Sequence, residues 1–283
     1  MSADKFWPLI ARFQAHEARL GARMQHHRVS AFIYEFFRFG VKQAWACLFG
    51  GAMVALIVAT HYAYPKEAFL PRYDFLFIAA LAIQCLMLAF RLETLDEAKV
   101  ILIYHVIGTA MEVFKTSAGS WIYPEAAFFR IGGVPLFSGF MYASIGSYIA
   151  RCWRLFDFRF AHHPSLWALS LLSIAIYLNF FSHHYMVDLR WLLFIVSAIL
   201  FRRVWVHYHI WHTHRRMPLL LGLFLVSLFI WFAENLATWA HAWTYPHQAV
   251  GWGMVSFGKL GSWFLLLMVS YTLVAWVNKP EQV

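Results

Sequence analysis

Eight long, continuous apolar stretches constrain the fold of this chain more than any other feature of its sequence. Each is about 17–22 residues long, the length that crosses the hydrocarbon core of a bilayer as an α-helix. The apolar residues run continuously rather than alternating, which disfavours a membrane β-barrel. We therefore predict an all-α, polytopic membrane bundle of about eight transmembrane helices, at about residues 41–62, 73–90, 98–114, 132–152, 164–182, 188–205, 217–234 and 258–277.

Composition supports a membrane protein and excludes most soluble classes. The chain is 61% hydrophobic and 13% charged, with a mean hydropathy of +0.58, which is too apolar for a soluble domain. In a soluble protein, the formal net charge of +9 would suggest nucleic acid as a partner. Here the excess is explained by basic cytoplasmic loops, so we expect membrane lipids as partners and no nucleic acid.

Basic residues gather in alternate loops and so predict the topology. Most lie in the N-terminal tail, in the loops at 91–99, 151–163 and 202–216, and at the C-terminus. By the positive-inside rule both termini are then cytoplasmic, and we place the protein in the bacterial inner membrane. Residues 1–39 form either an amphipathic helix on the membrane surface or a loosely ordered cytoplasmic tail.

One pattern occurs twice in the chain. Glu112, Trp121, Tyr123 and Pro124 recur 122 positions later as Glu234, Trp243, Tyr245 and Pro246, with the same internal spacing. Each copy follows the third predicted helix of a four-helix unit. We therefore predict a tandem 4+4 pseudo-repeat with three parts, namely a polar segment 1–39, a first membrane unit 40–158 and a second membrane unit 159–283. Equal orientation of the two units would place both copies on the extracytoplasmic side, around an axis along the membrane normal.

Six motifs are distinctive, namely Glu35–Gly40, Pro71–Phe75, Gly119–Glu125, Gly133–Ser144, Tyr177–His184 and Ala233–Asn235. On these motifs the chain resembles, over roughly residues 35–277, a family of bacterial multi-pass membrane proteins catalogued as domain of unknown function 817. The resemblance implies an integral membrane protein and no particular activity.

A shorter set of residues comprises Glu112, Tyr123-Pro124 and Gly132-Gly-Val-Pro-Leu136. This set resembles the membrane carotenoid cyclases and hydratases. In those families a carboxylic acid near the bilayer is thought to protonate a polyene double bond. The resemblance implies acid catalysis on an isoprenoid-like substrate.

Glu112 and Glu234 are the candidate catalytic residues, because a carboxylate that closes an apolar run is costly unless it is paired or protonated. Burial suits such a group to act as a general acid or a proton carrier, and two carboxylates across the interface between the units would titrate as a coupled pair. The alternative is a structural role, in which each Glu bonds Trp or Tyr and holds an outer loop in place.

The neighbouring aromatic residues are the candidate substrate-binding set, together with one amide. Trp and Tyr also accumulate at both bilayer interfaces whatever the activity, so an aromatic belt is the alternative. For Asn235 the alternative is hydrogen bonding between helices. The set comprises Trp121, Tyr123, Trp243, Tyr245 and Asn235.

Candidate metal ligands are few, and we expect no cofactor beyond a divalent metal. His183, His184 and Asp188 lie in one short loop and could ligate zinc or iron, although an interfacial hydrogen-bonding loop explains them as well. The run His207–His214 lies among basic residues without a carboxylate, which favours contact with anionic lipid head groups over a metal. Glu93, Asp96 and Glu97 are interpreted as a solvated loop.

Two functional classes remain open beside a non-catalytic scaffold. The favoured one is a membrane-embedded acid–base enzyme that acts on a lipophilic, isoprenoid-like substrate at the extracytoplasmic side, where Trp and Tyr could stabilise a carbocation. The other is a proton-coupled transporter or carrier with its site between the two units. Few Gly or Pro residues interrupt the apolar runs, which argues against the broken helices of many transporters.

Overall fold

A computed structural model describes residues 28–65, 67–211 and 214–283. The predicted N-terminal segment 1–39 lies largely outside the described residues, and its last part belongs to the first described helix. That helix is α2 (Arg28–Ala46).

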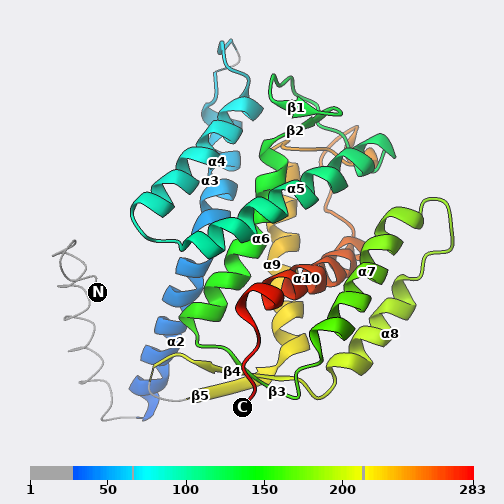
Figure 1. Cartoon of the computed structure of the whole chain (residues 1–283). Helices are drawn as coiled ribbons and strands as arrows, with labels where there is room; N and C mark the ends of the chain where they lie inside the picture. Colours follow the sequence, from blue (N-terminus) through cyan, green and yellow to red (C-terminus); the bar gives the residue numbers. More distant parts are fainter. Residues whose placement is uncertain (1–27, 66, 212–213) are drawn as a thin grey trace.

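The described chain is mostly helical, as predicted (Figure 1). Seven of the eight predicted apolar segments each correspond to one helix, and the first, 41–62, covers the end of α2 and most of α3 (Leu48–Ala63). The other helices are α4 (Arg72–Ala89), α5 (Leu95–Ser117), α6 (Phe137–Leu155), α7 (Leu166–Ser182), α8 (Arg190–Phe201), α9 (Leu219–Trp239) and α10 (Phe257–Asn278), with a short 3-10 helix η2 (Pro246–Gln248) before α10.

Fewer helices than predicted have the length and composition of a full membrane span. In the described part of the chain α4, α5, α9 and α10 qualify, and a fifth span is reached if α2 and α3, bent by 70°, count as one. The shorter α7 and α8 are apolar but have 17 and 12 residues, so α8 rises only about 18 Å against a core of about 30 Å. The described chain therefore has several apolar helices, as expected of a multi-pass membrane protein. The predictions of eight spans and of a 4+4 repeat are not confirmed.

Two small antiparallel sheets correct the all-α prediction. A two-stranded ladder joins β1 (Arg130–Ile131) to β2 (Val134–Pro135). A three-stranded sheet in the order β3-β4-β5 joins β3 (Arg159–Ala161), β4 (Trp205–His209) and β5 (His214–Pro218). The β4–β5 hairpin is the basic 202–216 loop of the sequence, where aromatic and β-branched residues favour strands. The C-terminal segment joins this sheet, because the Phe160 N–H donates to the Glu281 carbonyl at 2.9 Å (Figure 1).

Glycines allow α5 and α6 to approach closely. A Cβ at Gly108 would lie 2.7 Å from the Cβ of Tyr142, and one at Gly146 would lie 2.6 Å from the ring of Tyr104. Small residues at such contacts are typical of packed membrane helices. The close approach fixes Tyr142 of α6 against α5, which carries Glu112.

Two of the three acids at the start of α5, Glu93 and Glu97, are buried, contrary to the interpretation as a solvated loop. Arg151 is completely buried, and its Nη2 lies 3.4 Å from Oε1 of Glu93. Arg154 lies 3.0 Å from Glu97, which also caps the N-terminus of α5. Only Asp96 of the three acids is solvated. The prediction was wrong because Arg151 belongs to the last turns of α6, not to a loop.

Candidate active site

The two copies of the repeated pattern lie side by side. The Ile122 N–H donates to the Thr244 carbonyl at 3.0 Å, and the Thr244 N–H donates back to Ile122 at 2.9 Å. These two residues occupy equivalent positions in the two copies. The antiparallel bridge therefore holds the segment after α5 against the segment after α9, and brings both motifs to one end of the bundle.

Glu112 is buried and accepts three hydrogen bonds. Its Oε2 accepts from Trp121 Nε1 at 2.8 Å and from the Tyr123 hydroxyl at 2.6 Å. Its Oε1 accepts from the Tyr142 hydroxyl at 2.7 Å. Burial disfavours the charged form of this carboxyl, but the three hydrogen bonds oppose that effect more strongly than two would.

Glu234 is buried too but has fewer donors. Its Oε1 accepts from the Tyr245 hydroxyl, and its Oε2 accepts from Trp263 Nε1 at 2.7 Å. The Tyr123 and Tyr245 phenols remain protonated donors at neutral pH, because burial first, and then the adjacent carboxylates, raise the pKa of both phenols well above the usual range.

Lys259 places a positive charge between the two motifs. Its Nζ lies 4.5 Å from the ring centroids of both Trp121 and Tyr245, within range of a cation–π contact. The two rings themselves pack edge to face at 5.8 Å. With two carboxylates and one ammonium the cluster carries a net negative charge when all are ionised, so one added proton makes it neutral.

An apolar cavity of about 820 Å³ extends from this cluster. Both carboxylates and Lys259 line one part of it, and the remaining wall is mainly apolar. On α9 the lining residues extend from Leu219 to Leu236, a rise of about 26 Å. The cavity is within the size range of ligand pockets and has the shape to take an elongated apolar molecule.

Comparison with known proteins gives a family. The model of the family described as "Protein of unknown function (DUF817)" matches residues 35–271, most of the chain and both motifs. The chain belongs to this family. A relative in Bacillus subtilis (strain 168), "Uncharacterized protein YoaT", is 45% identical over 250 residues, which cover 88% of this chain and 94% of the relative. No solved structure matches.

The family resemblance predicted from motifs is therefore confirmed, whereas the likeness to carotenoid cyclases stays a prediction. In this DUF817 member the predicted site residues separate into two groups. Glu112, Trp121, Tyr123, Trp243, Glu234 and Tyr245 all line the apolar cavity. Asn235 does not, because its amide donates to the Trp231 carbonyl at 2.8 Å and accepts from the Val255 N–H at 2.9 Å. Its observed bonds hold the loop before α10 against α9.

The predicted metal ligands are engaged with other partners. His183 Nδ1 lies 3.0 Å from the Asn179 carbonyl, and His184 Nε2 lies 2.9 Å from Lys115 Nζ. Asp188 accepts from Asn179 and pairs with Arg190 at 3.1 Å, and these bonds hold its pKa below the usual range despite the opposing effect of burial. In the part of the chain that the structure describes, no three His, Cys, Asp or Glu residues are grouped to hold a metal ion. His212 of the basic His run lies outside that part.

Sequence reasoning missed three members of the site. Tyr142 and Trp263 come from α6 and α10, and neither belongs to the repeated pattern. Lys259 is a lone basic residue at the start of an apolar run, on the side where the loops hold few cations. That isolation is the signal that could have found it.

Proposed function

We propose that this protein is a membrane-embedded acid–base enzyme that acts on a lipophilic, isoprenoid-like substrate. The observation that carries the proposal is the position of two buried carboxylates at one end of an elongated apolar cavity. An apolar chain would enter the cavity, and a double bond of that chain would meet the carboxylates.

The unequal surroundings of the two carboxylates favour different roles. Glu234 accepts two hydrogen bonds from its neighbours, so it is the better residue to carry the proton. Glu112, which accepts three, would stay ionised and stabilise positive charge. The proton of Glu234 adds to an alkene carbon and leaves a carbocation and a carboxylate. Loss of a proton from an adjacent carbon to Glu234 restores the acid and leaves a rearranged double bond, without oxidant or co-reactant.

Aromatic rings would assist this step. Trp121 and Tyr245 already lie against the ammonium of Lys259, so their faces suit a cation. The apolar wall would exclude water, which would otherwise trap a carbocation as an alcohol.

The proposed function also includes the predicted orientation of the protein in the bacterial inner membrane, with both termini on the cytoplasmic side. The sheet end of the bundle carries Arg202, Arg203 and Arg216 as well as the C-terminal segment, and basic residues favour the cytoplasmic side. The carboxylates lie near the other end of α9, which would face the extracytoplasmic side. The paired Ile122 and Thr244 support the tandem 4+4 arrangement.

A proton-coupled carrier is the second candidate. It is favoured by the meeting of one carboxylate from each predicted unit at a shared cavity, which resembles a site between repeats. A carrier would move its ligand unchanged, whereas an enzyme would alter the covalent structure of a lipid.

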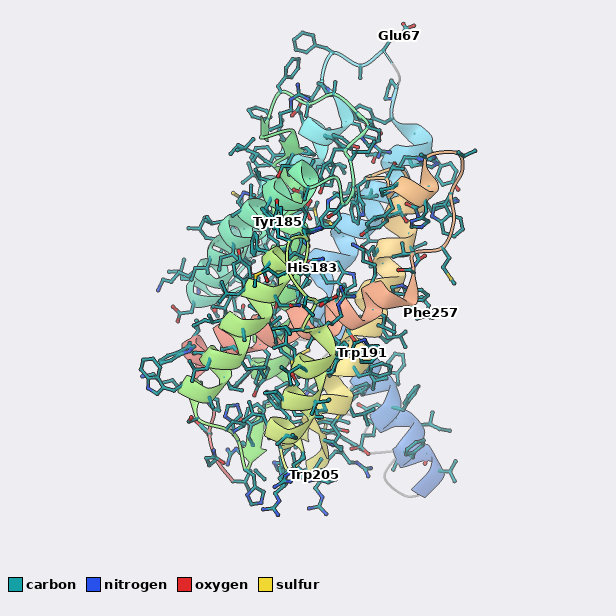
Figure 2. The ribbon with its side chains drawn as sticks, turned by 90° about the vertical axis from the view of Figure 1, so that its right-hand side faces the viewer. Glu67, His183, Tyr185, Trp191, Trp205 and Phe257 are labelled. Carbon is teal, nitrogen blue, oxygen red and sulfur yellow. The ribbon has the colours of Figure 1, made fainter. Side chains whose placement is uncertain are left out.

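The test replaces each carboxylate by its neutral isostere in cells and analyses lipid extracts by mass spectrometry. Glu234→Gln removes the proposed general acid and should reduce one product species by about 10²-fold or more. Glu112→Gln removes the anion that stabilises positive charge and should reduce the same species. Glu67→Gln is the matched control, because Glu67 is exposed at the tip of the molecule (Figure 2).

The outcomes separate the candidates. A lipid change shared by both variants and absent in the control supports the enzyme. An unchanged lipid extract with loss of pH-dependent flux in proteoliposomes supports the carrier. Wild-type behaviour of both variants in both assays would assign Glu112 and Glu234 a structural role.

A further inference from the structure

A second, smaller cavity of about 200 Å³ adjoins the apolar one and is basic. Lys115 of α5, Arg190 of α8 and Lys259 of α10 line it, and no carboxylate does among the described residues. Figure 2 shows this region, where the α7–α8 connection, labelled at His183 and Trp191, lies beside the start of α10 at Phe257. Hydroxyl and amide groups complete the polar lining, from Ser120, Asn179, Ser256 and Ser262.

Lys115 is the cation whose position most needs an explanation. Its side chain is only 3% exposed, and its Nζ contacts His184 and the ring of Phe180, whose centroid is 4.0 Å away. No described acidic side chain lies within ion-pair distance of it. A buried ammonium without a counter-ion is unfavourable, so an anion that joins this pocket would gain a strong charge-assisted contact.

The other two cations leave room for an anion. Arg190 shares its charge with Asp188, which is partly exposed. The ammonium of Lys259 forms no hydrogen bond or ion pair with the described side chains, and it lies against two aromatic rings in the electrostatic field of Glu112 and Glu234. Cationic side chains from three helices thus converge on one pocket, and Lys and Arg are the side chains that most often bind phosphate in proteins.

Backbone groups favour the same ligand. Ser256 and Gly258 lie in the pocket wall at the first turn of the 22-residue α10, and no side chain caps this helix. The first N–H groups of a helix lack intrahelical partners and carry a partial positive charge, which favours phosphate. The pocket has the volume of about six or seven water molecules at about 30 Å³ each, enough for a phosphoryl group.

The two cavities share a wall, made of Trp121, Phe180, Lys259, Ser262 and Leu266. An anionic head group in the basic pocket would therefore lie next to a chain in the apolar cavity. We propose that the basic pocket binds the phosphate or diphosphate head group of a lipid alcohol whose isoprenoid-like chain occupies the apolar cavity. The isoprenoid nature of the chain rests on the proposed function, whereas the recognition of the phosphate rests on the basic pocket alone.

The test compares two probes that differ only in the head group. Geranylgeranyl phosphate and geranylgeraniol are titrated onto the full-length protein in phosphatidylcholine nanodiscs. The wild-type protein should bind the phosphate at least about 10-fold more tightly than the alcohol, since a hydrogen bond between charged groups contributes that much. Lys115→Gln and Arg190→Gln should each weaken binding of the phosphate by about 10- to 100-fold and leave binding of the alcohol unchanged.

Two controls keep the result interpretable. Arg130→Gln removes one charge at an exposed residue outside the pocket and should leave the ratio of affinities unchanged. Arg190 is 29% exposed, so its substitution tests the pocket even if Lys115→Gln fails to fold, and Lys115→Arg should restore the preference.

Equal binding of phosphate and alcohol by the wild-type protein would overturn the proposal. So would a preference that survives both glutamine variants. Inorganic phosphate is the third probe. If it binds as tightly as geranylgeranyl phosphate, the pocket is a site for the free anion and not for a lipid. The affinity ratio and the lipid-extract result for Glu112 and Glu234 are independent, so the head-group pocket and the proposed chemistry can fail separately.

Discussion

At the scale of the residue, the spacing within the repeated pattern has a hydrogen-bonding explanation for one copy and a partial one for the other. Trp and Tyr placed nine and eleven residues after Glu112 both donate to its carboxylate. In the second copy Tyr245 donates to Glu234, but the indole donor is Trp263 of α10 in place of Trp243. Buried carboxylates need such partners, because an unsatisfied buried acceptor is strongly unfavourable. The pattern therefore contains two donors to Glu112 but only one of the two donors to Glu234, so the two copies are not equivalent in their hydrogen bonds.

The Tyr123 hydroxyl should contribute measurably to stability. Tyr123→Phe removes the donor at 2.6 Å from Glu112 and should lower the free energy of unfolding by about 1.5–3 kcal/mol, as expected for a hydrogen bond to a charged group. Thermal unfolding of the detergent-solubilised protein measures this. Tyr185→Phe, at an exposed side chain, should change stability by less than about 0.5 kcal/mol. Equal effects of the two substitutions would contradict the assignment.

At the scale of the element, the contact between α5 and α6 determines whether Tyr142 reaches Glu112. Gly108→Ala would place a methyl group 2.7 Å from the Cβ of Tyr142 and so force the helices apart. We expect a loss of about 1–3 kcal/mol in stability, the usual cost of overpacking. Gly51→Ala is the matched control, because nothing lies within 4 Å of its added Cβ. If both variants unfold at the same temperature in a thermal-shift assay, the close approach of α5 and α6 is wrong.

The buried pair of Glu93 and Arg151 joins the start of α5 to the end of α6. Arg151→Met leaves the Glu93 carboxylate buried without its cation, and the loss of stability should be about 3–5 kcal/mol. Denaturant unfolding measures it. Lys99→Met removes an exposed charge paired with Asp96 and should cost at most about 1 kcal/mol. A double variant Glu93→Gln with Arg151→Met that recovers part of the loss would support a direct pair, and a purely additive double variant would argue against it.

At the scale of the whole molecule, the sequence predicts where the helices lie along the chain, but it predicts less about the segments that connect them. Continuous apolar runs locate α3 to α10, because a helix that crosses the hydrocarbon core needs about 20 predominantly apolar residues. The same runs overestimate the number of full spans, since α8 has 12 residues in an apolar region about 18 residues long. The sheet formed by β3, β4 and β5 was missed because charge dominates the sequence of its hairpin. Lys259 and Trp263 were missed because they reach the carboxylates only through the packing of α10.

The predicted orientation can be tested directly. In a variant whose three cysteines are replaced, Tyr185→Cys in the α7–α8 connection should react with a membrane-impermeant maleimide in intact cells. Arg203→Cys beside the basic sheet should react only after the membrane is permeabilised. Both side chains are exposed, so a difference in labelling reports the side of the membrane. The reverse labelling pattern would place the carboxylates on the cytoplasmic side.

The central claim is that Glu234, with the ionised Glu112 beside it, transfers a proton to and from the carbon skeleton of a lipophilic molecule. Isolated membranes that contain the protein can be incubated in D₂O, after which the extracted lipids are analysed by mass spectrometry. With the wild-type protein, one lipid species should gain deuterium at a carbon that does not exchange by itself, and Glu112→Gln and Glu234→Gln should abolish this gain while Glu67→Gln preserves it. An extract in which no species gains deuterium, or in which the gain survives both active-site substitutions, would contradict the account.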